Sequence, residues 1–96
     1  MRPSAALALK RMEVCELVRQ FRCINPRIFG SVLRGADHDG SDLDILVDAL
    51  PGTTLFDLGG LQEALETELG IRVDLRTPND LAVGFRDAVL AEAKPL

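Results

Sequence analysis

The sequence contains no tryptophan and no tyrosine, and only one histidine and two cysteines among its 96 residues. A catalytic triad or a metal site that depends on histidine is therefore almost excluded, because the single histidine, His38, lies in a loop of glycine and aspartate. Cys15 and Cys23 show no spacing typical of a metal site, which favours two reduced cysteines that pack in the fold. Modification of the chain on its own tyrosine is impossible.

Long apolar runs and an excess of positive charge are also missing. The longest apolar stretches are too short to span a bilayer, and Met1-Arg2-Pro3 is not followed by a secretory apolar core, so we expect a cytoplasmic protein. The net charge of −4, from 15 acidic and 11 basic residues, argues against a domain that coats a nucleic-acid backbone. It leaves room for a small phosphorylated ligand, because a metal ion can supply positive charge locally.

The chain length and the hydrophobic pattern predict a single α/β (α+β) domain over residues 1–96, with a small mixed sheet covered by helices. The leucines between residues 55 and 69 share one helix face, and Gly70 is typical of a helix end. A capping box of Thr77 and Asp80 indicates the start of the last helix, which we expect to end near Ala93. The other expected elements are a helix at 5–22, a short helix at 32–35, and strands at 27–29, 43–47 and 71–76.

Two aspartates interrupt the strand expected after residue 41. Because side chains alternate along a strand, Asp42 and Asp44 share one face, while Leu43, Ile45 and Val47 occupy the other. Two carboxylates so close repel each other, and a divalent cation such as Mg²⁺ relieves that repulsion with hard oxygen ligands. Asp74 lies on the polar face of the next strand and is the natural third ligand if the two strands pair.

Gly30 and Ser31 precede the aspartates at the end of an apolar run. Glycine lets the backbone approach a ligand closely, and the N-terminus of the following short helix favours an anion. Ser31 adds a hydroxyl donor. A phosphate-binding turn beside a carboxylate pair is typical of a site for a metal-bound nucleoside triphosphate.

Each of these features also has an ordinary structural interpretation. A Gly-Ser pair is common in turns, Asp42 fits a strand edge, and Asp74 fits the water-facing side of an open sheet. Arg34 is equally compatible with a solvated helix position and with a phosphate contact, and Asp37 fits a loop role. The order and spacing of the whole set favour the functional interpretation.

The stretch "FGSVLRGADHDGSDLDILVD", residues 29–48, resembles the signature of the nucleotidyltransferase superfamily related to DNA polymerase β. The whole chain is similar to the minimal nucleotidyltransferases, antitoxins encoded beside HEPN toxins. The resemblance implies that Gly30 and Ser31 hold the triphosphate of ATP, that Asp42 and Asp44 bind Mg²⁺, and that Asp74 completes the acidic triad and helps deprotonate the attacking hydroxyl. Leu33 departs mildly from the small residue frequent at its position.

The resemblance implies an enzyme that transfers AMP from ATP to a tyrosine of its HEPN toxin, without direct nucleic-acid or membrane binding. A competing hypothesis is a module of the same fold that neutralises its toxin by binding alone, with an idle site. An antibiotic-modifying nucleotidyltransferase is a weaker alternative, because the sequence shows no second, substrate-holding domain.

Overall fold

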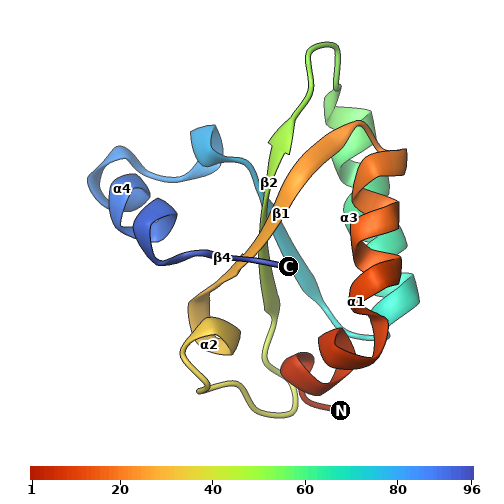
Figure 1. Ribbon diagram of the computed structural model, residues 1–96, viewed down its shortest axis with the longest axis vertical. Helices are drawn as coiled ribbons and strands as arrows, with labels where there is room; N and C mark the ends of the chain where they lie inside the picture. The colour runs from red at the N-terminus through yellow and green to blue at the C-terminus, as the bar shows by residue number, and fades with distance from the viewer.

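The computed structural model describes residues 1–96 and alternates helices with strands (Figure 1). Most of the expected elements are present, with shifted boundaries. In chain order they are α1 (Pro3–Gln20), β1 (Cys23–Phe29), α2 (Gly30–Leu33), β2 (Leu43–Ala49), α3 (Leu55–Leu69), β3 (Val73–Arg76), the 3₁₀ helix η1 (Pro78–Asp80), α4 (Val83–Glu92) and β4 (Lys94–Pro95).

The four strands form one mixed sheet in the order β3-β2-β1-β4. β1 runs antiparallel to both β2 and β4, whereas β2 and β3 are parallel. In the parallel pair, Asp44 lies directly opposite Asp74. The predicted mixed sheet is therefore confirmed, and its register brings together two of the predicted site residues.

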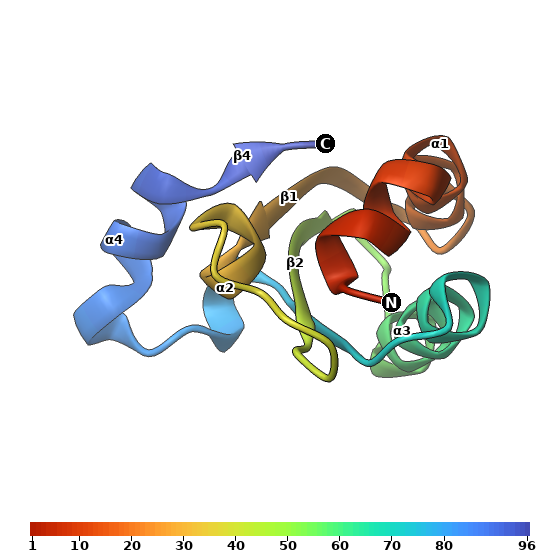
Figure 2. The same ribbon diagram turned by 90° about the horizontal axis from the view of Figure 1, so that it is seen from below.

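The main hydrophobic core lies between the sheet and the two long helices, α1 and α3, which cover one face side by side (Figures 1 and 2). Side-chain alternation along β2 sends every second residue into this core and the residues between them to the opposite face. Gly70 ends α3 in the left-handed conformation, at φ 69°. The core residues from β2 and α3 are Leu43, Ile45, Val47, Leu61, Leu65 and Leu69.

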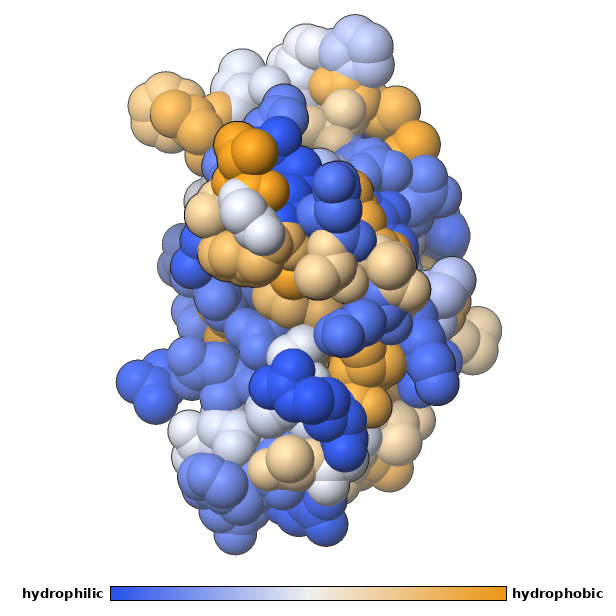
Figure 3. Space-filling view, turned by 90° about the vertical axis from the view of Figure 1, so that its left-hand side faces the viewer, coloured by the Kyte–Doolittle hydropathy of each residue, from blue (hydrophilic) through white to orange (hydrophobic).

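The opposite face of the sheet is covered only in part, by α2 and α4 (Figure 2). α4 buries none of its own residues, and Val83 and Phe85 are 80% and 50% exposed. Figure 3 shows this side of the molecule, where hydrophobic and hydrophilic areas alternate. Arg86 fastens the start of α4 by donating from Nη2 to the carbonyl oxygen of Leu81 at 3.0 Å. The polar face of the sheet thus stays accessible.

The C-terminal part of the chain differs from the prediction of one helix starting after Thr77. The capping box is present, and the Thr77 N–H donates to Asp80 at 3.0 Å, but it starts only the turn η1. The backbone is extended at Leu81, and α4 begins afresh at Val83. Leu81 is 4% exposed, so the burial of its side chain accounts for the break in the helix.

Two strands also exceed the prediction. β1 begins at Cys23 instead of Arg27, because Asn25 takes a positive φ of 54° and a register shift between Ile24 and Arg27 carries the strand past Pro26. β4 spans two residues that pair with β1. A segment that short carries no periodicity from which a strand could be predicted.

Asp37 is the only buried charged residue, and it caps α1 from a distant loop. Its Oδ2 accepts the backbone N–H of Ser4 at 2.9 Å, and Arg2 Nη2 donates to Oδ1 at 3.4 Å. No side chain of the helix's own N-cap residue performs this role. The hydrogen bond from Ser4, with help from Arg2, holds the pKa of Asp37 below its ordinary value. Asp37 is therefore structural, as the loop interpretation predicted.

We predict that Asp37→Asn lowers the thermal unfolding midpoint at pH 7 by a few degrees, because a neutral amide accepts the Ser4 N–H more weakly. The folded-state pKa is depressed, so this stabilisation is present above about pH 4 and is lost as the pH falls through the folded-state value. The difference in thermal midpoint between the two proteins should therefore shrink as the pH is lowered below 4. The exposed neighbour substitution Asp39→Asn is the control, and an equal loss there would contradict the capping role.

Candidate functional site

The centre of the candidate site is the carboxylate pair of Asp44 and Asp74, which the parallel register of β2 and β3 places opposite each other. Asp44 is half-buried. Its pKa is raised to about 6, first by burial, then by the charge of Asp74 and a hydrogen bond with it, and to a smaller extent by Asp42. Asp44 therefore keeps its proton up to about pH 6, as expected for a half-buried carboxylate that lies beside others.

Gly30, the first residue of α2, brings the backbone between β1 and α2 against this pair. Its φ is +73°, and a Cβ added there would overlap Oδ2 of Asp44 and lie 3.0 Å from its Cγ. Only glycine permits this contact between backbone and carboxylate. Ser31 follows at the start of α2, where backbone N–H groups have no partner within the helix. The predicted phosphate turn and the predicted acidic strand are thus in direct contact.

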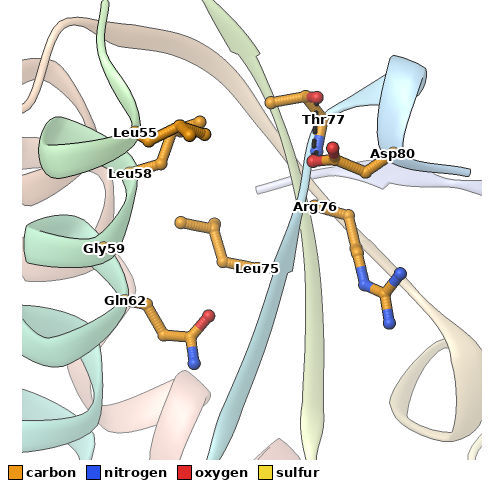
Figure 4. A pocket seen from close by; sticks show the side chains of 8 residues that line it. All are labelled: Leu55, Leu58, Gly59, Gln62, Leu75, Arg76, Thr77 and Asp80. Atoms are coloured by element: carbon orange, nitrogen blue, oxygen red, sulfur yellow. Dashed lines mark hydrogen bonds between the residues drawn. The ribbon is translucent and has the colours of Figure 1, made fainter.

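Two arginines complete the polar face, Arg72 just before β3 and Arg76 at its end. Arg76 Nε lies 2.9 Å from Oδ1 of Asp74, and its Nη2 lies 3.4 Å from Oδ2. Arg72 Nε lies 3.1 Å from Oδ1 of Asp42. Figure 4 shows the alternation that produces this arrangement, with Leu75 directed toward α3 and Arg76 on the other side of β3. The sequence predicted this shared face for Arg72, Asp74 and Arg76, but not the ion pairs.

Asp42 and Arg34 are more exposed than Asp44 and Asp74 and do not form part of the central carboxylate pair. Asp42 precedes the first residue of β2, has a side chain 47% exposed, and faces Arg72. The structure consequently brings no three acidic side chains together as a ready metal site. Arg34 occupies the C-cap position of α2, where its backbone N–H makes the capping hydrogen bond. Its side chain is exposed. The ion pairs of the structure do not include it.

The donor set fits a divalent cation. Asp44 and Asp74 provide hard oxygen ligands from adjacent strands, and a cation can take the place of the proton that Asp44 holds. Asp42 can join them if it leaves Arg72, and an ion pair this exposed stabilises by only about 0–1 kcal/mol. The residues present are therefore suitable for Mg²⁺.

A cavity of about 220 Å³ lies nearby, between α3 and β3 (Figure 4). Leu55, Leu58 and Leu75 form its apolar wall. Its volume is below the roughly 300–1,000 Å³ of typical small-molecule sites. Arg76, Thr77 and Asp80 border the cavity as well, but its small volume leads us to place the candidate site on the open polar face around Asp44 and Asp74.

Comparisons with known proteins agree on the fold and family. Residues 11–96 match the family described as nucleotidyltransferase domain. The protein adenylyltransferase MntA of Thermococcus cleftensis is 40% identical over 77 residues, covering 80% of this chain and 78% of that protein. A relative from Methanocaldococcus jannaschii is 42% identical over 66 residues, covering 69% of this chain and 71% of its own.

Solved structures give the same result. A structure described as a minimal nucleotidyltransferase superposes with a TM-score of 0.87 at 42% identity, covering 97% of this chain and 95% of that one. A toxin–antitoxin crystal structure with AMP-PNP matches with a TM-score of 0.74 at 24% identity, over 88% of this chain and 69% of that one. The second match, at its low identity, supports the fold.

We predict that Gly30→Ala destabilises the protein more than Gly35→Ala does. Both glycines have a φ near +70°, but only a Cβ at position 30 meets other atoms, those of Asp44. Each substitution should cost about 1–2 kcal/mol for the left-handed backbone, and Gly30→Ala should cost more. Urea unfolding measures both. In the Asp44→Ala background the two losses should become equal, and a persistent difference would contradict the proposed contact.

A second prediction concerns Asp44→Asn. The folded-state pKa of Asp44 is raised to about 6 from 3.8, so the folded protein binds more protons than the unfolded chain between these values. Ionisation of Asp44 therefore lowers stability as the pH rises from about 4 to 6. In EDTA, Asp44→Asn should raise the thermal midpoint by a few degrees at pH 7.5 and not at pH 4. Asp87→Asn, an exposed change on α4, is the control, and destabilisation by Asp44→Asn at pH 7.5 would assign Asp44 a structural role.

Proposed function

The chain belongs to the nucleotidyltransferase domain family, and we propose that it is an antitoxin that transfers AMP from ATP to a hydroxyl of a HEPN toxin. Nucleotidyltransferase activity follows from the family and from the adenylyltransferase relatives. The single observation that carries the finer proposal is the contact of Gly30 with Asp44, itself in register with Asp74. It joins a phosphate turn to a carboxylate pair.

We assign the triphosphate to the turn of Gly30 and Ser31, with Arg34 as a further phosphate contact from the end of α2. Asp42, Asp44 and Asp74 would hold Mg²⁺. When bound, the ion supplies positive charge to the phosphate oxygens. Gly30 lets the chain approach the phosphates, and the first-turn N–H groups of α2 donate to them.

The transfer requires one new bond, one broken bond and one proton acceptor. The acceptor oxygen bonds to the α-phosphorus of ATP, the bond from that phosphorus to the bridging oxygen breaks, and pyrophosphate leaves. The hydroxyl proton goes to a carboxylate oxygen of Asp74. Asp74 suits this role because it lies on β3, a different strand from the one whose Asp44 contacts the phosphate turn, and its carboxylate can accept a proton.

The acceptor must belong to another protein if it is a tyrosine, because this chain has none. The toxin–antitoxin complex with AMP-PNP supports a toxin as that partner and a hetero-oligomer as the working form. We treat residues 1–96 as one minimal nucleotidyltransferase unit. An ATP-dependent reaction would place it in the cytoplasm; no helix is long and apolar enough to cross a membrane.

The test is intact mass spectrometry of the partner toxin after incubation with this protein, ATP and Mg²⁺. We expect one or more added AMP groups. Asp74→Asn should reduce the rate by roughly 10²–10⁴-fold, the usual contribution of a general base, while calorimetry shows retained affinity for Mg²⁺-ATP. Asp87→Asn, an exposed change on α4, is the control. A toxin that binds the folded protein and stays unmodified would reject the enzyme and favour neutralisation by binding alone.

A further inference from the structure

Two arginines, one just before β3 and one at its end, make a pattern that the proposed reaction leaves unexplained. Arg72 directly precedes β3, and Arg72, Asp74 and Arg76 are spaced two residues apart, as expected for side chains on one polar face. Each arginine pairs with a different carboxylate of the proposed triad, Arg72 with Asp42 and Arg76 with Asp74. Two of the three proposed metal ligands are therefore each neutralised by a guanidinium group of the same protein.

The geometry of the Arg76 pair bears directly on metal binding. Its Nε and Nη2 lie 2.9 Å and 3.4 Å from the two different oxygens of Asp74. A carboxylate engaged on both oxygens has fewer lone pairs to offer, and the adjacent positive charge repels a cation. Metal and arginine therefore compete for Asp74, and the same reasoning applies to Arg72 and Asp42.

These two ion pairs can be broken and replaced by other partners at little cost to the stability of the fold. The side chains of Arg76 and Asp74 are 44% and 37% exposed, and those of Arg72 and Asp42 are 78% and 47% exposed. Such ion pairs add little to stability. By contrast, Arg27 on β1, at the other side of β2, is only 16% exposed and donates to both oxygens of Asp48 at 3.0 and 3.2 Å.

We propose that Arg72 and Arg76 are internal counter-ions that compete with a divalent cation for Asp42 and Asp74, and that bind the phosphates of the donor nucleotide once released. The phosphate half of this inference rests on the proposed function; the competition for metal does not. A guanidinium group offers planar paired donors that match phosphate oxygens as well as they match a carboxylate.

The consequence is that metal and nucleotide help each other to bind. A cation that binds alone must displace the arginines from their carboxylates, and the displaced guanidinium groups then have no anionic partner. A cation that arrives with a triphosphate provides the released guanidinium groups with new anionic partners. The two ligands are thus coupled through Arg72 and Arg76, and the coupling must act equally in both directions.

The test uses Arg76→Gln and Arg72→Gln in titration calorimetry, first with Mg²⁺ alone and then with Mg²⁺ and a non-hydrolysable ATP analogue. Each variant should bind Mg²⁺ alone about tenfold more tightly than the unmodified protein and the nucleotide about tenfold more weakly, the equivalent of one charge-assisted hydrogen bond. Arg76→Lys should fall between. Arg19→Gln controls for the lost charge, because Arg19 is exposed on α1 and joins no ion pair.

Opposite changes in the two affinities would support the proposal. If Mg²⁺ affinity in both glutamine variants equals that of Arg19→Gln, the competition is absent and the proposal falls. Unchanged nucleotide affinity would overturn its phosphate half. Thermal melts verify that every variant is folded. A partner that is never modified, together with tighter Mg²⁺ binding by the variants, would reject AMP transfer and leave the competition standing, so the two failures are distinguishable.

Discussion

The parallel, in-register pairing of β2 with β3 is the constraint on which the site depends. It places Asp44 opposite Asp74, and no adjustment of side chains could separate their Cα atoms without disrupting the ladder. A slip of one residue would turn Asp44 toward α1 and α3 and bring a core residue to the polar face. The buried leucine, isoleucine and valine on the other side of β2 prevent that slip, so the hydrophobic core fixes the separation of the two carboxylates.

Because the two carboxylates are held this close, they repel each other. Three features of the surroundings reduce that repulsion or accommodate it. Gly30 allows the carboxylate of Asp44 to sit against the backbone, a proton resides on Asp44 up to about pH 6, and Arg76 pairs with Asp74. Each of these arrangements is reversible under mild conditions. The fold thus keeps unfavourable charges together with partners that the proposed metal-bound nucleotide would replace, which is how strain is retained at functional sites.

The sequence predicted what depends on local chemistry. Helix α3 with its Gly70 end, the capping box at Thr77 and the shared face of Arg72, Asp74 and Arg76 follow from periodicity and turn residues. The break at Leu81 and the strand β4 depend on tertiary burial and pairing, which leave no local signal. The pairing of Asp42 with Arg72 was equally invisible, because it joins side chains that are distant in the sequence.

Asp37 connects the first turn of α1 to the loop that leads to Asp42. The segment between α2 and β2 joins the phosphate turn to Asp42, and the bond from Ser4 to Asp37 attaches its middle to the first turn of α1. One long loop becomes two short ones, so the chain on either side has fewer conformations to lose when a ligand orders it. A change that frays the first turn of α1 would therefore also loosen the chain that leads to Asp42.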